Sequence, residues 1–453
     1  MRDGSSNWPE RPLGELLDIV RHTVIPGTYP EEQFVHYSIP AWDEMRGPAL
    51  ESGASIGSAK LAINQPTILV SKLNPRIPRV VLVENPIGPR YCASTEFIPY
   101  VAQAEGVSLR FYKWLLEGPT FQRRLEGIAT GSTNSHKRAH PAETLRWPVP
   151  YPPPQEQSHI ATVLDTVDEV IAKTEVVIAK LKQVRAGLLY DLLTRGLDLS
   201  ACDLPVGRHD AQAGEHGHLR DPIAHPGQFQ DSPLGRIPMG WEVRSLESVT
   251  DVSAPICYGI VQALEFVADG VPVLVIRDLL GDYVTGIHRT AKTIDASYAR
   301  SRVRPGDVLI SIKGTIGRID VVPKNYEGNI SRDLARIRPT DRVRAKYLLH
   351  LLRSQMGQKI LEQAQVGTTR AELSIGPLKR LYFAFPKPAE QESIACMLDE
   401  HEATIRTHEV ELAKLRELKS GLMTDLLTGR VRVPVLPQDL DGLVGTMATG
   451  RNR

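Results

Sequence analysis

The feature that most constrains this chain is a long stretch that occurs twice. Residues 152–194 match residues 386–428 at 20 of 43 positions without a gap. A shorter match lies upstream of each copy, because "NWPERPLGELLDI" at 7–19 aligns with "GWEVRSLESVTDV" at 240–252, and both contain a tryptophan in the second position. The chain is therefore predicted to consist of two halves of one design, each of which opens near a tryptophan and closes with the repeated segment.

Apolar residues in both copies recur in alternating steps of four and three, which is the heptad spacing of a coiled-coil helix. A helix of about 40 residues is about 60 Å long, too long for one small core, so we expect the two helices to form an antiparallel pair that separates two globular domains. An ordinary interdomain coiled coil without a spacing role is the alternative. Polar residues interrupt the pattern at Thr174 and Arg185 in the first copy and at His408 and Lys419 in the second. The expected apolar seam consists of Ile160, Leu164, Val167, Ile171, Ile178, Leu181, Leu188 and Leu192, then Ile394, Leu398, Ile405, Leu412, Leu415, Leu422 and Leu426.

Helix start and stop signals set the expected domain limits. Pro154 and Pro388 suit the first turn of a helix, where a missing amide costs little, and Gly196 suits a helix end. The predicted division is a first globular domain at 1–153, a helix at 154–196, a linker at 197–235, a second globular domain at 236–387, a helix at 388–430 and a tail at 431–453.

The two globular domains show the same order of mixed elements, which predicts an α+β fold. Residues 65–85 and 306–323 each contain two short β-branched runs around a turn that carries Lys or Arg. Residues 111–133 and 346–369 each read as a helical hairpin that ends in small hydroxyl residues. Basic and hydroxyl residues on turns between rigid elements suit contacts with DNA phosphates and base edges.

The net charge of the chain is only +1, but Lys and Arg gather locally. Residues 289–346 contain 14 Lys and Arg residues against 6 Asp and Glu residues. A solvated basic face and plain helix-ending turns are the alternatives to nucleic-acid binding. The candidate DNA contacts, chosen as polar or basic tips of turns, are Lys72, Asn74, Arg76, Ser132, Thr133, Asn134, His136, Lys137, Lys313, Thr315, Arg318, Thr368, Thr369 and Arg370.

No catalytic signature emerges from the sequence. It has no phosphate-binding loop, no GxSxG or HExxH motif and no dinucleotide-binding turn. "ENPIG" at 84–88 lacks the second proline and the aromatic residue of an amino-methyltransferase tetrad. Four histidines between 209 and 225 are interpreted as solvated linker residues, so we expect no metal site and no cofactor in this chain. Because the four cysteines show no paired spacing and the sequence shows no secretory leader, we expect the chain to be in a reducing cytoplasm. The sequence contains no run of 18 apolar residues, so we expect no membrane-spanning helix.

The motifs together resemble the specificity subunit of a type I restriction-modification enzyme. The resemblance rests on two diverged domains, each followed by Pro-x-x-Glu-Gln and a long helix that ends in "GLLYDLL" or "GLMTDLL", and on "LRDPIAHPGQFQDSPLGRIPMGWEV" at 219–243. It spans residues 7–432, although "NWPERPL" departs from the family's usual domain entry. The resemblance implies a subunit without activity of its own, in which two target recognition domains read a bipartite asymmetric DNA site.

The same resemblance implies partners and their cofactors. Two methyltransferase subunits would dock on the helices and use S-adenosylmethionine, and restriction subunits would use ATP and Mg²⁺. Three alternatives stay open at this point. The chain could be the specificity module of a related system that combines cutting and modification in one partner, a structural coiled-coil adaptor that does not bind DNA, or a methyltransferase.

Overall fold

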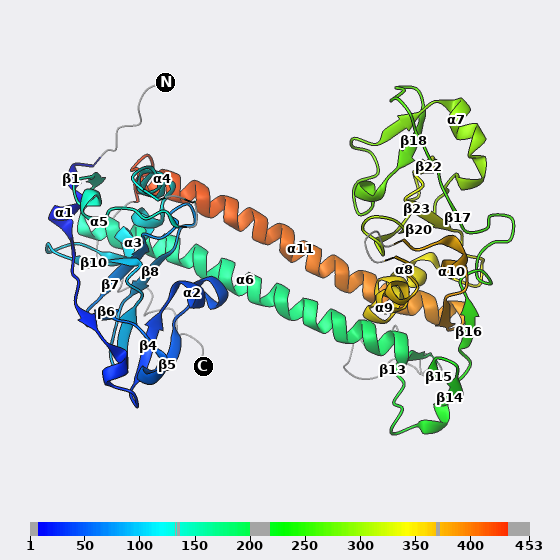
Figure 1. The fold of residues 1–453 in the computed structure, drawn as a ribbon, viewed down its shortest axis with the longest axis horizontal. Coiled ribbons are helices and arrows are strands. Elements are labelled where there is room, and N and C mark those ends of the chain that lie inside the picture. The colour runs from blue at the N-terminus through cyan, green and yellow to red at the C-terminus, as the bar shows by residue number, and fades with distance from the viewer. Residues whose placement is uncertain (1–7, 132, 134–135, 200–217, 368–371, 434–453) are drawn as a thin grey trace, which may run out of the picture. The chain divides into compact units, whose positions relative to one another are not determined.

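The computed structural model describes residues 8–131, 133, 136–199, 218–367 and 372–433. Contacts divide the chain into two compact units. Unit 1 comprises Met1–Val176 and Val410–Arg453, and unit 2 comprises Val177–Glu409. Each long helix thus contributes one half to each unit. The predicted class is confirmed, because both units combine sheets and short helices with a pair of long helices (Figure 1).

The two long helices are α6, Pro154–Thr194, and α11, Pro388–Leu427. Both begin at the expected proline. Gly196 follows the end of α6 with a φ of +64°, and Gly429 follows the end of α11 with a φ of +71°. This left-handed conformation favours glycine and turns the chain away from the helix axis.

The helices run antiparallel, as predicted, in both units (Figure 1). In unit 1, Arg416 donates to Glu175 at 2.7 Å, while Lys419, further along α11, donates to Asp168, an earlier residue of α6, also at 2.7 Å. The order is reversed in the same way in unit 2, where Lys182 pairs with Glu409 at 2.7 Å and Arg185 donates to Glu402 at 3.2 Å.

Residues of the predicted seam are buried or half-buried along both helices. The polar residues that interrupt the seam have specific partners, since Arg185 and Lys419 each reach a carboxylate on the opposite helix. Both pairs are half-buried. An ion pair at a seam position costs stability relative to an apolar pair but selects one register. These pairs therefore favour the observed alignment of the helices.

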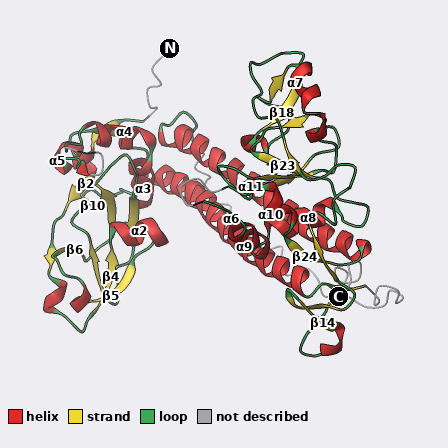
Figure 2. Ribbon diagram, turned by 45° about the vertical axis from the view of Figure 1, so that its right-hand side comes forward, coloured by secondary structure: helices red, strands yellow, loops and turns green. Residues whose placement is uncertain are grey.

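The described part of unit 1 contains two larger sheets, which lie beside the long helices, and one two-stranded sheet (Figure 2). The antiparallel sheet β2-β10-β7-β8 is formed by Leu17–Ile19, Phe97–Ala102, Thr67–Ser71 and Val80–Val83. The sheet β3-β6-β9-β4-β5 is formed by Thr23–Val24, Lys60–Ile63, Arg90–Ala93, Gln33–Tyr37 and Ala49–Ser52, and its β4 and β9 are parallel. β1, Glu10–Pro12, pairs with β11, Pro148–Pro150.

The helices of unit 1 cover the first sheet and complete its core. α3, Leu109–Glu117, packs on β7 and β8 and is followed by α4, Pro119–Gly127, so the predicted helical hairpin is confirmed. The core joins this hairpin to α6 and to the end of α11 through Trp114, Leu164 and Leu426. Shorter helices are α1, Leu13–Leu16, α2, Ile39–Met45, and α5, Pro141–Thr144, with 3-10 turns η1, Pro26–Thr28, and η2, Gly53–Ser55.

Unit 2 repeats the central sheet. β17-β23-β20-β21, formed by Cys257–Tyr258, Leu334–Ile337, Val308–Ser311 and Ile319–Val321, has the strand order of β2-β10-β7-β8. α8, Ala345–Arg353, and α9, Gln355–Gln363, form its helical hairpin. A second sheet joins β19, His288–Thr290, β18, Val271–Leu274, and β22, Asn329–Ile330. Further elements are β16, Glu242–Ser245, with β24, Tyr382–Phe385, and η6, Ile276–Asp278, α7, Lys292–Ser297, η7, Ala299–Ser301, and α10, Ile375–Lys379.

The described ends of the expected linker are structured. β12, Leu197–Asp198, pairs with β13, His218–Leu219, and the 3-10 turn η5, Pro226–Gln228, leads into a hairpin of β14, Phe229–Ser232, and β15, Gly235–Pro238. These strands place Arg220 against the first turn of α11. In the described part of the chain, no helix has the length and hydropathy needed to cross a bilayer.

A buried carboxylate ties each domain start to a long helix. In unit 2, Glu390 in the first turn of α11 accepts hydrogen bonds from Trp241 Nε1 at 3.1 Å, from Arg220 at 2.6 Å and from the backbone N–H of Leu197 at 2.8 Å. In unit 1, Glu156 in the first turn of α6 accepts from Trp8 Nε1 at 3.1 Å and from Arg432 at 2.7 Å. We call these two clusters the Trp-Glu-Arg clasps.

The clasp of unit 1 is charged at neutral pH. Burial alone raises the pKa of Glu156, but hydrogen bonds from Arg432 and Trp8 and the charge of Arg432 outweigh it, so this pKa lies below its ordinary value. In each clasp the tryptophan comes from the start of a domain, the glutamate from the start of one long helix, and the arginine from the segment that follows the other long helix. The clasps therefore connect the two halves of the sequence repeat.

Candidate nucleic-acid interface

The candidate residues of unit 1 come together on one edge of its central sheet. Residues 72–76 follow β7, and Thr130 and Arg138 exchange backbone hydrogen bonds at the base of a small hairpin. The two segments are joined because Asn74 donates its backbone N–H to Lys137 O at 2.8 Å, and Ala139 donates to Lys72 O at 3.0 Å. Candidates that lie more than 50 residues apart in sequence thus share one surface.

Cations are available on this surface. Arg76 is exposed and Lys72 and Lys137 are half-buried, and among the described residues none of the three has a carboxylate within ion-pair distance. The neighbouring Arg138 is different, since it pairs with Glu96 at 2.9 Å, and this hydrogen bond and charge raise its pKa. Arg138 therefore braces the hairpin, while the other three cations are available to phosphates.

Two further candidates form a local contact. The Thr133 hydroxyl lies 2.7 Å from His136 Nδ1 at the exposed hairpin tip. Asn74 has a left-handed φ of 47°, which a residue other than glycine adopts at a cost. Such strain is common where a side chain is held for binding. Ser132 and Asn134 lie outside the described residues.

Unit 2 has the same arrangement at the equivalent edge. Residues 312–318 follow β20, and Val366 and Glu372 form the base of a second small hairpin. Leu373 donates to Ile312 O at 2.9 Å, and Lys313 pairs with Glu372 at 3.1 Å. Thr315 and Arg318 are exposed on this loop. Thr368, Thr369 and Arg370 lie outside the described residues.

The structure adds two arginines that the sequence reasoning missed. Arg332 is 54% exposed beside the 312–318 loop, because Ile312 donates to Asp333 O at 2.8 Å. Arg277 is 73% exposed, and its neighbour Ile276 would lie 3.8 Å from a Cβ built on Gly314. A repeated tripeptide, Arg-Asp-Leu, occurs at 277–279 and 332–334 and places an exposed arginine before a buried leucine both times. That repeat is the signal that could have identified them.

Much of the basic surplus between residues 289 and 346 is used inside the fold. Arg336 is 2% exposed and donates to backbone oxygens of Arg302 and Pro255, and burial lowers its pKa. Arg338 pairs with buried Asp307 at 2.7 Å. The local excess of positive charge is therefore a weaker sign of DNA binding than its size suggests, and the exposed Arg318, Arg277 and Arg332 are better markers.

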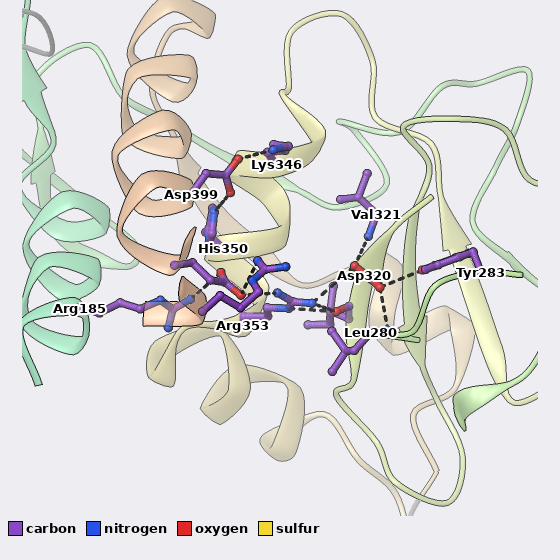
Figure 3. A network of polar contacts seen from close by, with 12 residues as sticks. Arg185, Leu280, Tyr283, Asp320, Val321, Lys346, His350, Arg353 and Asp399 are labelled. Atoms are coloured by element: carbon purple, nitrogen blue, oxygen red, sulfur yellow. Dashed lines mark hydrogen bonds and ion pairs between the residues drawn. The ribbon is translucent and has the colours of Figure 1, made fainter. Parts of the chain in front are cut away.

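Polar contacts connect this loop region to the helix pair of unit 2 (Figure 3). Glu402 of α11 accepts from Arg185 and lies 3.9 Å from Arg353 of α8. Arg353 lies 3.6 Å from Asp320 of β21, and Asp320 accepts from the Tyr283 hydroxyl at 2.9 Å and from the Leu280 N–H at 2.8 Å. Since β21 directly follows the 312–318 loop, these contacts connect the strand after the loop, and the neighbouring residues Leu280 and Tyr283, to the helix pair.

A second carboxylate of α11 anchors α8. Asp399 accepts from His350 Nε2 at 2.9 Å and from Lys346 (Figure 3). Burial alone raises the pKa of Asp399, but these hydrogen bonds and charges outweigh it and lower the pKa from 3.8 to about 2. In unit 1 the corresponding Asp165 of α6 accepts from Arg110 and Trp114 of α3. Each helical hairpin is thus attached to a long helix through an aspartate of that helix, Asp165 in unit 1 and Asp399 in unit 2.

The depressed pKa of Asp399 makes unit 2 sensitive to acid. The carboxylate stabilises the folded state above about pH 4, and this contribution is lost as the pH falls from about 4 to about 2, because the unfolded chain then binds the proton more tightly. Allowing for 30% exposure of the side chain, we expect about 1–2 kcal/mol. Asp399→Asn should remove this part of the pH dependence in urea unfolding at pH 4, 3 and 2. An equally steep loss in the variant would contradict the assignment.

The side chains available on the described parts of these surfaces are mainly of the kind that binds nucleic acid. Cations, hydroxyls and an amide line them, and they include the Thr133 hydroxyl beside His136 Nδ1. Among the described residues, no group of three or more His, Cys, Asp or Glu side chains is placed to hold a metal ion. His209 and His216 lie outside the described residues.

Parts of the chain are similar to known proteins. A family model described as the type I restriction modification DNA specificity domain matches residues 238–417. The chain is 28% identical over 294 residues to the specificity subunit of the type I restriction enzyme EcoBI from Escherichia coli, covering 62% of this chain and 58% of that protein. It is 24% identical over 298 residues to the MjaVIII specificity subunit from Methanocaldococcus jannaschii, covering 63% and 62%. The alignments thus span about three fifths of these curated relatives.

Solved structures share the fold. The S subunit of a type I restriction-modification system from M. genitalium superposes with a TM-score of 0.55 at 13% identity, over 95% of this chain and 97% of that one. A chain from a structural study of assembly and conformational transition of the type I system has a TM-score of 0.52 at 20% identity, over 94% and 98%. Residues 238–417 therefore match the type I restriction modification DNA specificity domain, and about three fifths of the chain is similar in sequence to specificity subunits of type I restriction enzymes.

Proposed function

We propose that the chain is the DNA-recognition subunit of a type I restriction-modification complex and that it reads a bipartite, asymmetric site. One observation carries the proposal. Each unit places a basic loop and a small hairpin at the same edge of an equivalent sheet, although the loop sequences differ. Two domains with the same fold but different loop side chains are suited to recognise two different half-sites.

The long helices are proposed to carry the partners. Exposed apolar side chains recur at equivalent positions of the repeat, with Val176 and Val410 at 68% and 54% exposure and Val184 and Leu418 at 48% and 51%. Exposed apolar residues that are repeated in this way suit docking of two copies of one protein. The proposed copies are methyltransferase subunits, with restriction subunits joining them.

Catalysis is assigned to those partners. Methyl transfer from S-adenosylmethionine and ATP- and Mg²⁺-dependent cutting would take place on the methyltransferase and restriction subunits, and this chain would supply no catalytic group or cofactor site. The candidate loops support this division, because their described side chains are mainly cations, hydroxyls and an amide, which bind phosphates and bases. Sequencing of methylated bases in a host that expresses the chain with its methyltransferase tests the whole proposal by yielding the modified motif.

Arg318 provides a direct test of the interface. Arg318→Ala is expected to weaken binding of the motif by the assembled complex about tenfold, because an exposed arginine on the 312–318 loop contributes about 1–3 kcal/mol when it reads a base. Fluorescence anisotropy with a labelled duplex measures the affinity, and size-exclusion chromatography checks that the complex is intact.

A matched control separates this effect from general loss of charge. Arg430→Ala removes an arginine that is 64% exposed in unit 1 near the end of α11, and it should leave the affinity unchanged at physiological salt. Equal affinities for wild type and Arg318→Ala would remove Arg318 from the interface. Failure of the wild-type complex to prefer any duplex over a scrambled one would instead favour an adaptor that does not bind DNA.

A further inference from the structure

An apolar cluster is exposed on unit 2 beside the candidate loop. Val261, Leu264 and Phe266 are 41%, 67% and 60% exposed within six residues. Val261 and Leu264 line a cavity of about 610 Å³ together with Val273 and Ile276, and the Phe266 ring lies 6.1 Å from the ring of His288, another lining residue. Exposed apolar clusters of this kind mark interaction sites more often than chance, because water disfavours them.

The cluster is held in place by the fold. Leu264 has a left-handed φ of 55°, a conformation that costs energy for a residue with a side chain. The segment around it is fixed on both sides, since the Thr290 hydroxyl donates to Ala263 O at 2.6 Å and Val267 donates to Arg289 O at 2.9 Å. Ile260 also donates to Ile330 O at 2.7 Å. The backbone of this segment therefore holds the Leu264 side chain in its exposed position.

Positive charge borders the cavity. Arg277 and Arg332 are both exposed and line it together with one carboxylate, Asp333, which lies 3.8 Å from Arg332, while Arg277 lies 3.6 Å from Asp278. His288 also lines the cavity, and among the described residues nothing bonds to its buried Nε2. Two arginines over an apolar floor, continuous with the 312–318 loop, complement DNA better than a neutral or acidic partner.

We propose that the Leu264 surface, which consists of Val261, Leu264, Phe266, Arg277 and Arg332, reads a thymine in the major groove of one half-site. This inference rests on the proposed function and extends it to a base. The C5-methyl group of thymine is the apolar feature of the major groove, and apolar side chains recognise it by contact. Arginines at the border would bind a neighbouring guanine or the phosphates.

Replacing single thymines of the modified motif with deoxyuridine tests the inference, because this change removes only the methyl group. For the complex of the full chain with its methyltransferase subunits, we expect one such replacement to weaken binding about fourfold, as expected for losing burial of one methyl-sized group. Leu264→Ala should lower the affinity for the thymine duplex and abolish this difference. Arg277→Ala should weaken binding of both duplexes about tenfold and retain the difference.

Val252→Ala is the matched control, because Val252 is 93% exposed in the same unit and does not line the cavity. It should keep both the affinity and the thymine preference. The inference is overturned if no thymine replacement weakens wild-type binding, or if Leu264→Ala keeps the full preference. In either case a wild-type complex that still selects the motif over a scrambled duplex leaves the proposed function standing.

Discussion

Replacing Glu390 with alanine is expected to destabilise unit 2 by about 3–5 kcal/mol, because it removes the shared acceptor of a buried charge network. Glu390 is 6% exposed and binds Trp241, Arg220 and the Leu197 N–H. The substitution leaves the Arg220 guanidinium, which is 14% exposed, without its carboxylate partner. In a unit of this size the loss corresponds to a fall of about 10 °C in the midpoint of thermal unfolding, measurable by calorimetry on the full chain.

Glu392 provides the control, since it lies two residues further along the same helix and is 70% exposed. It pairs with Arg344 at 3.1 Å on the surface, and such pairs contribute about 0–1 kcal/mol. Glu392→Ala should therefore shift the midpoint very little. If the two variants unfold at the same temperature, the clasp does not stabilise unit 2 in the way we describe.

Alanine at Gly196 is expected to destabilise unit 2 by about 3 kcal/mol or more. Part of the cost is the left-handed φ of +64°, and the rest is steric. A Cβ at this position would lie 2.6 Å from Trp241 Cζ2 and would overlap Glu390 and Arg220. Chemical denaturation of the full chain, followed by tryptophan fluorescence, would detect the change because Trp241 is in the clasp.

Gly187, inside α6, is the matched control for Gly196, which follows the end of that helix. A Cβ at Gly187 would meet no atom within 4 Å, and the residue lies in the helix interior, where alanine is favoured over glycine by about 0.5–1 kcal/mol. Gly187→Ala should therefore raise stability while Gly196→Ala lowers it. Opposite signs for the same change at these two glycines would identify the left-handed backbone and the packing at the clasp as the cause, and two small effects of the same sign would contradict this explanation.

The clasps also show how far a repeat can be interpreted without coordinates. Trp8 and Trp241, and likewise Glu156 and Glu390, stand at matching positions of the repeat. Their pairing was nevertheless missed, because a tryptophan and a glutamate about 150 residues apart give no local signal. Arg220 and Arg432 were harder still to predict, since they follow opposite helices and lie outside the aligned segments.

The candidate loops illustrate a different limit. Turn chemistry identified the 72–76 and 312–318 loops, and backbone hydrogen bonds place the first beside Lys137 and Ala139 and the second beside Leu373. Charge counting was less informative, because Arg336 and Arg338 look like DNA-binding residues in sequence but are used in the fold. Local composition does not distinguish a buried arginine from an exposed one.

What the sequence alone determined is the set of properties that depend on near neighbours along the chain. Heptad spacing predicted both long helices, their apolar sides and their antiparallel pairing, and β-branched runs predicted the strands of the central sheets. Only the tertiary structure decided which distant residues share a surface. The clasps, the burial of Arg336 and the position of Arg277 beside the 312–318 loop all depend on contacts between segments remote in sequence, and such contacts follow from packing of the whole unit rather than from local pattern.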